Sequence, residues 1–195
     1  MPYPIAHGLL AASLVAATSS EKPLLRNWKI LLLCAALGNL PDCDFFFVWI
    51  LHMGRSWHRA FSHSIVFSLM IGFGLAMLLA WLSKQPFKRT NAWLLTGAIL
   101  SHTLLDIATT RSAVSGAQVL WPFSNQRFAL NLFPYNGIES FLHRNTLVES
   151  IEGAFYFCLT ELVLFGTIFC LARLSRSFFE RFSQLVYGEF PSSSN

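Results

Sequence analysis

The sequence predicts an all-α membrane protein, in which about five transmembrane helices form one membrane-embedded domain over residues 1–195. Hydrophobic residues make up 54% of the chain, and its mean hydropathy is +0.49. Charged residues make up only 12%, about half of the roughly 25% found in soluble domains. This composition excludes a disordered chain, a disulfide-rich secreted scaffold and an ordinary soluble enzyme.

Each expected helix corresponds to a run of mostly apolar residues, because a transmembrane helix needs about 20 of them. The runs cover residues 5–20, 29–51, 63–83, 92–110 and 148–173. Residues 64–83 carry no charge, whereas the first run is shorter and weaker than the others. Its small-residue end resembles that of a signal peptide, but no positively charged region precedes it. We therefore expect a retained first helix.

The basic residues predict the orientation of the bundle. With the N-terminus outside, nine of the 14 Lys and Arg residues fall inside and five outside, as the positive-inside rule requires. The nine are Lys22, Arg26, Lys29, Lys84, Lys88, Arg89, Arg173, Arg176 and Arg181, and the five are Arg55, Arg59, Arg111, Arg127 and Arg144. The sequence thus predicts a multi-pass protein of a bacterial-type inner membrane with its C-terminus inside.

The connection before the last helix, residues 111–147, is unusually long for a loop. Its aromatic content argues against disorder. The aromatic residues are Trp121, Phe123, Phe128, Phe133, Tyr135 and Phe141. We expect this segment to lie at the membrane interface or to cover a site as a lid. Trp121 and Phe123 fit an apolar wall over the site and an interfacial aromatic belt equally well.

All three aspartates of the chain, Asp42, Asp44 and Asp106, fall in or beside apolar segments. An aspartate at the centre of a membrane helix costs roughly 2.5–3.5 kcal/mol. Pro41 kinks or breaks the second helix, which lets its two carboxylates converge, whereas in a straight helix they would diverge by about 200°. This spacing on irregular backbone predicts a cation site, and the alternative is a kinked helix with solvated carboxylates.

Histidines supply the other candidate ligands. His58 and His63 lie five residues apart near the start of the third expected helix, where a polar interfacial turn is the alternative. His102 and Asp106 lie four residues apart and so share one helical face, where they can bind a common ion or simply each other. His7, near the outer end of the first helix, is the weakest candidate when taken singly.

In the predicted topology these side chains all reach the outer side of the membrane. Neutral imidazoles and carboxylates together suit divalent ions such as Zn, Mn or Fe. Seven ligands exceed the needs of one tetrahedral zinc and fit two ions that share a bridging carboxylate, an arrangement common in phosphoester hydrolysis. The candidates are His7, Asp42, Asp44, His58, His63, His102 and Asp106.

At these residues the chain resembles the YdjM-like family of predicted membrane-bound metal-dependent hydrolases. The matching pieces follow the family order over residues 4–123. They are Pro4-Ile5-Ala6-His7, Leu40-Pro41-Asp42-Cys43-Asp44, His58-Arg59 through His63-Ser64, Ser101-His102 through Asp106, and Leu120-Trp121-Pro122-Phe123. The resemblance implies that the seven candidates bind the metal and that the reaction is a hydrolysis of unspecified substrate.

The chain departs from the family pattern at two places. Phe45-Phe46-Phe47 stand where the family often has a histidine shortly after its second aspartate, which removes an accessory ligand. The family also favours HRGxTHS, where this chain has Ala60 and Ser62 in place of the glycine and the threonine.

We therefore expect a metal-dependent hydrolase in which an activated water attacks a phosphoester or similar bond, in a lipid or another substrate, near the membrane surface. Arg59, with Arg127 as a second candidate, would steady a developing anion. Glu149 would act as general base or supplementary ligand, and so would Glu152, although acidic residues at a helix start also simply stabilise the helix dipole. Glu161 has no predicted partner.

Two other function classes remain open at this point. A divalent-metal transporter or sensor would use the same ligands, but transport needs ligands near the midplane and access from both sides. A membrane interaction protein would hold a structural metal closed to water. In every case membrane lipids are the expected partners, and no basic run predicts nucleic acid binding.

Overall fold

The computed structural model describes residues 2–18, 28–132 and 147–187, which are largely helical and form no named strand. The α-helices are α1 (Pro4–Thr18), α3 (Trp28–Leu37), α4 (Ile65–Ser83), α5 (Arg89–Thr109) and α6 (Leu147–Tyr187). The predicted all-α class is thus confirmed. The last helix ends 14 residues later than predicted. The helix predicted over residues 29–51 is divided into several shorter elements.

Among the described residues, three helical segments are long and apolar enough to cross a membrane: Ile65–Ser83, Arg89–Thr109 and Ile151–Phe179. A fourth crossing follows if Trp28–Leu37 and Leu40–Ile50, which are bent by 47° relative to each other, form one span. α1 has only 15 residues, or about 22 Å at 1.5 Å per residue, against a hydrocarbon core of about 30 Å. The expected five spans therefore exceed the three or four that length and composition support.

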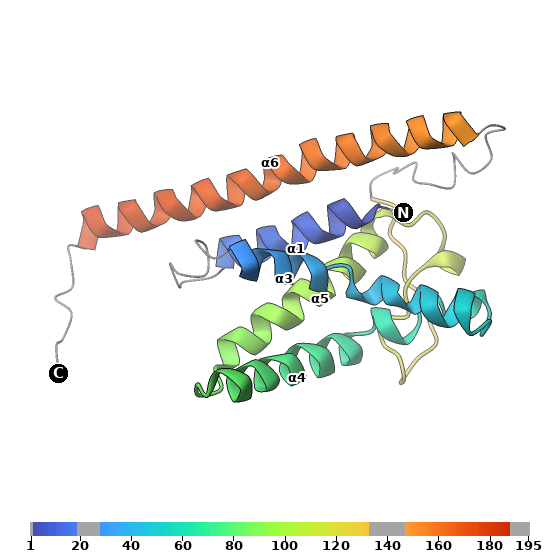
Figure 1. Cartoon of the computed structure of the whole chain (residues 1–195), viewed down its shortest axis with the longest axis horizontal. Coiled ribbons are helices and arrows are strands. Elements are labelled where there is room, and N and C mark those ends of the chain that lie inside the picture. Colours follow the sequence, from blue (N-terminus) through green and yellow to red (C-terminus); the bar gives the residue numbers. More distant parts are fainter. Residues whose placement is uncertain (1, 19–27, 133–146, 188–195) are drawn as a thin grey trace.

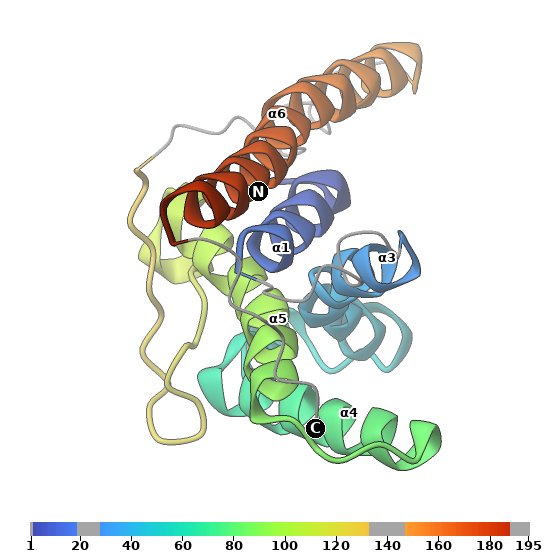
Figure 2. The same cartoon turned by 90° about the vertical axis from the view of Figure 1, so that its left-hand side faces the viewer.

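The helices pack in a fixed order from one side of the molecule to the other. α6 lies along α1, α1 also packs against α3 and α5, and α5 packs against α4 on the far side (Figure 1). The turned view shows α1 between α6 and α5 as well (Figure 2). The buried apolar core follows the same line, with Ala11 and Val15 of α1, Leu95 and Ile99 of α5, and Ala76 of α4.

Small residues allow α4 and α5 to approach closely. The fully buried positions of α4 are Ser68, Gly72 and Ala76, which recur every four residues and so form one narrow stripe. A Cβ on Gly72 would lie 2.6 Å from the backbone nitrogen of Thr96. This is the packing expected between membrane helices, where small side chains bring two backbones together.

The second predicted helix breaks near Pro41, as the sequence predicts. α3 ends at Leu37, and the chain continues as a 3-10 segment, η1 (Leu40–Asp44), and a π-helical segment, η2 (Phe46–Ile50). Proline removes one backbone donor and cannot continue an α-helix. After the break, Asp42 lies against His102 of α5, whereas Asp44 lies against His58 and Ser62.

The described part of the long connection is anchored rather than loose. Leu130 and Leu132 donate backbone hydrogen bonds to Ile107 and Ala108 near the end of α5. Ala117 and Phe128 pair as an isolated antiparallel bridge. Phe123 is 86% exposed, so it does not cover the site as a wall, whereas Trp121 packs edge-on against Phe61. The other aromatic residues of the connection, Phe133, Tyr135 and Phe141, lie outside the described residues.

Candidate metal centre

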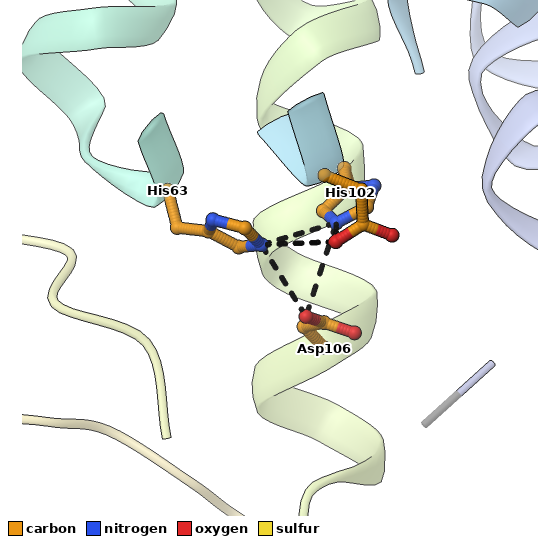
Figure 3. A group of neighbouring side chains, drawn as sticks. His63, His102 and Asp106 are labelled. Carbon is orange, nitrogen blue, oxygen red and sulfur yellow. Dashed lines mark hydrogen bonds and ion pairs between the residues drawn. The ribbon is translucent and has the colours of Figure 1, made fainter. Parts of the chain in front are cut away.

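The break after α3 brings two groups of histidines and aspartates together at one place. Asp42, His63, His102 and Asp106 form the inner group, whose ligand atoms all lie within 4.8 Å of one another. Asp42, Asp44 and His58 form the outer group on the same criterion. η1, the 3-10 turn η4 (Phe61–His63) and α5 supply the inner group, and Figure 3 shows His63 facing the two α5 residues.

The hydrogen bond of His102 fixes which of its nitrogens faces the centre of the inner group. Nδ1 lies 2.8 Å from the carbonyl oxygen of Gly38. A carbonyl only accepts, so Nδ1 carries the proton and donates. In the neutral ring, Nε2 therefore presents a lone pair, and this is the atom that faces His63.

His63 is oriented in the same way by a side-chain relay. The Ser62 hydroxyl donates to Asp44 Oδ2 at 2.9 Å and lies 3.0 Å from His63 Nδ1. Because that hydroxyl proton is committed to Asp44, the serine oxygen accepts from Nδ1–H. His63 Nε2 is left as a lone pair. Burial lowers the pKa of His63 from its ordinary value of 6.5, despite the opposing Asp106 carboxylate, and so favours the neutral ring.

With both imidazole rings neutral, the inner group therefore collects four electron-pair donors around one point. The Nε2 atoms of His63 and His102 lie 3.1 Å apart. Asp42 Oδ1 lies 3.4 Å from His102 Nε2 and 3.8 Å from His63 Nε2, and Asp106 Oδ2 lies 3.5 Å from His63 Nε2. Four ligands bound at about 2.0–2.1 Å in a tetrahedron are roughly 3.3–3.4 Å apart.

The donor set thus fits a divalent cation. Buried carboxylate oxygens that make no hydrogen bond support the same conclusion. Asp42 Oδ1 and both carboxylate oxygens of Asp106 are buried and have no hydrogen-bond partner among the described residues. A buried carboxylate without donors is costly. A cation between the four side chains would satisfy these oxygens and both imidazole lone pairs at once.

Asp44 lies behind the histidines rather than at the centre of the inner group. Its Oδ1 is 2.9 Å from His58 Nδ1, and its Oδ2 accepts hydrogen bonds from the Arg59 N–H and the Ser62 hydroxyl. This is the carboxylate–histidine arrangement that orients metal-binding imidazoles. The outer group can hold an ion only if the proton between Asp44 and His58 leaves, and Asp42 would then be shared by both groups.

His7 reaches the site from α1 but belongs to neither group. Its Nε2 lies 3.6 Å from Asp106 Oδ1, and its ring stacks on His102 with centroids 3.7 Å apart. The side chain is fully buried, and neither ring nitrogen has a hydrogen-bond partner among the described residues. The structure therefore brings all seven predicted ligands together, five around one point or beside it, with Asp44 and His58 at the outer edge.

Both arginines that were predicted to bind an anion form ion pairs or hydrogen bonds with other groups of the protein. Arg59 Nε lies 2.8 Å from Asp106 Oδ2, an ion pair whose angles are not those of a hydrogen bond. Its Nη1 donates to the Thr110 hydroxyl and the Ser115 carbonyl. Arg127 donates to the carbonyls of Ser56, His58 and Gly116, which fastens the connection to the turn before His58.

The predicted acidic candidates of α6 lie apart from both groups. Glu149 and Glu152 are exposed in the first turns of the helix. Glu161, by contrast, is fully buried, and its carboxylate accepts the backbone N–H groups of Tyr3 and Ala6.

Sequence reasoning missed the residues that act through the backbone or through a relay. The Gly38 carbonyl orients His102, and nothing in the sequence marks it beyond its place before the proline break. Two serines near the start of α4 have different roles: Ser64 caps the helix by accepting from the Phe67 N–H, and Ser62 orients His63.

Comparison with known proteins gives a family and one partial relative. The family model of the YdjM inner membrane proteins matches residues 1–181. Inner membrane protein YbcI of Escherichia coli (strain K12) is 35% identical over 97 residues, which cover 47% of this chain and 53% of that protein. The match therefore spans about half the length of this relative. No solved structure matches the chain.

Proposed function

The chain belongs to the YdjM inner membrane protein family, and from the geometry of its inner group we propose that it is a membrane-bound metal-dependent hydrolase. One observation carries the proposal: two imidazoles and two carboxylates face one another within 4.8 Å, and their buried carboxylate oxygens accept no hydrogen bond from the part of the chain that the structure describes. When bound there, a divalent ion such as Zn, Mn or Fe lowers the pKa of a water molecule and polarises the bond to be cleaved.

Different residues of the chain bind the ion, orient its ligands and compensate their charge. Asp42, His63, His102 and Asp106 hold the ion, and Asp44 with Ser62 keeps the His63 ring in one tautomer. Arg59 balances the charge of Asp106 in an ion pair. Because Asp42 belongs to both groups, the outer group offers a place for a second ion, as in two-ion phosphoester hydrolases.

The burial of the cluster indicates where a substrate enters. The side chains of His7, His63, His102 and Asp106 are fully buried, whereas those of Asp42 and His58 are 17% and 23% exposed. Within the described part of the cluster, the edge with Asp42 and His58 is therefore where a substrate can enter without rearrangement of the helices.

The surroundings of this edge support a lipid phosphoester as substrate. Phe45 stacks on His58 with ring centroids 4.5 Å apart, and Phe46 and Trp49 follow on η2 with exposed fractions of 49% and 71%. An apolar, aromatic surface beside an anion-hydrolysing site suits a molecule with a phosphate headgroup and apolar chains. We propose that the headgroup enters here, from the extracytoplasmic side predicted by the basic residues.

The experiment is a hydrolysis screen with purified protein in detergent, loaded with Zn²⁺, Mn²⁺ or Fe²⁺. The substrates are phospholipids and a soluble aryl phosphate, and the matched variants are Asp106→Asn and an exposed substitution, Thr160→Ser. The proposal expects phosphate release that requires metal, is lost in D106N and is retained in T160S. Turnover that survives chelation or D106N, or no turnover of any phosphoester by metal-loaded protein, contradicts it.

A transporter that uses the same ligands is distinguished by metal flux into proteoliposomes. The burial of the inner group and its single exposed edge favour hydrolysis over a path open to both sides. Metal uptake that exceeds that of D106N, in the absence of hydrolysis, would replace the proposed reaction with transport.

A further inference from the structure

Glu161 is a charged residue in the middle of a membrane-spanning helix, and it is fully buried although α6 is mostly exposed. Only 11% of the most apolar window of Ile151–Phe179 is buried inside the protein, but the Glu161 side chain is 0% exposed. An acidic side chain at membrane depth is costly and marks a functional position unless a partner satisfies it.

The partners of this carboxylate are backbone donors at the start of α1. Oε1 accepts from the Tyr3 N–H at 2.6 Å, and Oε2 accepts from the Ala6 N–H at 3.0 Å. The first N–H groups of a helix lack intrahelical acceptors, and the positive end of the helix dipole favours a negative charge. Glu161 therefore caps α1 from another helix, and both its oxygens are used.

The capped turn carries His7, which follows Ala6 directly. No hydrogen bond from the described residues holds either nitrogen of the His7 ring. Its place against Asp106 and His102 therefore depends on the position of its backbone. Two contacts define that position: the cap from Glu161 on one side, and the close approach of Gly38 to the His7 carbonyl on the other.

We propose that Glu161 is a positioning residue of the metal centre, which holds the first turn of α1 so that His7 meets the ion. This inference rests on the proposed function insofar as it requires a metal at the inner group. It also explains why a carboxylate is retained in a helix that otherwise has an apolar surface.

The test is a Co²⁺ titration of the whole protein in detergent, followed by visible absorption, because the d–d bands report the ligands around the ion. The variant is Glu161→Gln, which keeps the size of the side chain but replaces one acceptor oxygen with a donor group. The matched control is Thr160→Ser, at an exposed position directly before Glu161 on the same helix. Loss of such a supporting partner weakens metal affinity about 10–100-fold.

The inference expects E161Q to bind Co²⁺ about 10-fold more weakly than wild type, with altered d–d bands, and T160S to match wild type. In a His7→Ala background, E161Q should have no further effect on affinity or spectrum, because residues that act through one another are not additive. If E161Q does not yield folded protein, the same measurements are made on Glu161→Asp, which keeps the charge on a shorter side chain.

A thermal destabilisation of E161Q with unchanged affinity and spectrum would make Glu161 a purely structural residue and overturn the inference. Equal losses of affinity from E161Q in the wild-type and H7A backgrounds would also overturn it. If wild-type protein binds no Co²⁺ at all, the metal centre and the proposed function fail together, whereas normal Co²⁺ binding by both wild type and E161Q removes only the role of Glu161.

Discussion

The Nε2 atoms of His63 and His102 face each other at 3.1 Å, and in the neutral rings the bonds of both Nδ1 atoms leave each Nε2 as a lone pair. Two lone pairs at this distance repel unless a cation lies between them. The relationship joins a 3-10 turn to the middle of α5, 39 residues further along the chain. It is therefore a property of the tertiary structure.

The first prediction concerns metal content. His63→Ala and His102→Ala should each lose the ion of the inner group, because each removes one of its four ligands. Metal per chain is measured by mass spectrometry after loading and gel filtration in detergent. His52→Asn is the matched control, since His52 is exposed and asparagine tolerates its positive φ of 51°. Equal metal in all three variants would show that the cluster is a polar network.

The second prediction separates ligands from the residues that orient them. Asp42→Asn should abolish binding at the inner group, whereas Asp44→Asn and Ser62→Ala should keep one ion per chain but bind it about 10–100-fold more weakly. The reason is that Asp44 and Ser62 contact the Nδ1 side of His63 and not its Nε2. Titration with Zn²⁺ checks this, with the exposed Cys43→Ser as control. Complete loss of binding in D44N would make Asp44 a ligand.

The third prediction concerns the contact of α1 with Gly38. A Cβ at this position would lie 2.6 Å from the Ala11 Cβ and 2.7 Å from the His7 carbonyl oxygen. Gly38→Ala should therefore push α1 away, destabilise the protein by about 1–3 kcal/mol and weaken metal binding. Gly74→Ala is the control, because a Cβ there meets nothing within 4 Å. Thermal unfolding of the two variants should differ clearly in midpoint, and equal midpoints would contradict this packing.

The fourth prediction concerns the buried charge of Asp106. Arg59→Gln removes its cationic partner and should destabilise the metal-free protein by about 3–5 kcal/mol, the usual cost of leaving one member of a buried ion pair alone. Added Zn²⁺ should restore much of this loss, since the ion then compensates the carboxylate. Unfolding midpoints are compared with and without metal, and the exposed Arg55→Gln serves as control. An R59Q midpoint that metal does not raise beyond its effect on wild type would argue against this compensation.

The fifth prediction is the effect of pH. Burial lowers the pKa of His63 below 6.5, so the unfolded chain binds a proton more readily than the folded one. Stability from this residue is present above pH 6.5 and is lost as the pH falls below it. Metal-free protein should thus unfold at lower temperature at pH 5 than at pH 7, and His63→Asn should show a smaller difference. An identical pH dependence in the variant would remove His63 as its source.

The sequence predicted the elements of the site well because its signals are local. Pro41 predicted the break that brings Asp42 to the site. The four-residue spacing of His102 and Asp106 predicted that both lie on one face of a helix, which is α5. The 64–83 run became α4 almost without change, with Ser64 as its cap. Each of these signals depends on residues within one or two helical turns.

The remaining features depend on contacts between distant segments, which local patterns do not encode. Asp44 looked like Asp42 in the sequence, and only the fold shows that its oxygens face Arg59, His58 and Ser62. Glu161 lies more than 150 residues from the N–H groups that it accepts. The exposure of Phe123 likewise follows from how the connection is attached to α5.

The inner group takes its ligands from η1, η4 and α5, three segments that leave the ribosome one after another. During synthesis, a chain that ends before residue 102 has Asp42 and His63 but lacks the other half of the coordination set. An ion that binds the inner group would therefore be captured only after α5 has been made, and it would link three segments that are made separately. Because Glu161 accepts hydrogen bonds from the first turn of α1, the position of His7 would be fixed later still, when α6 is in place.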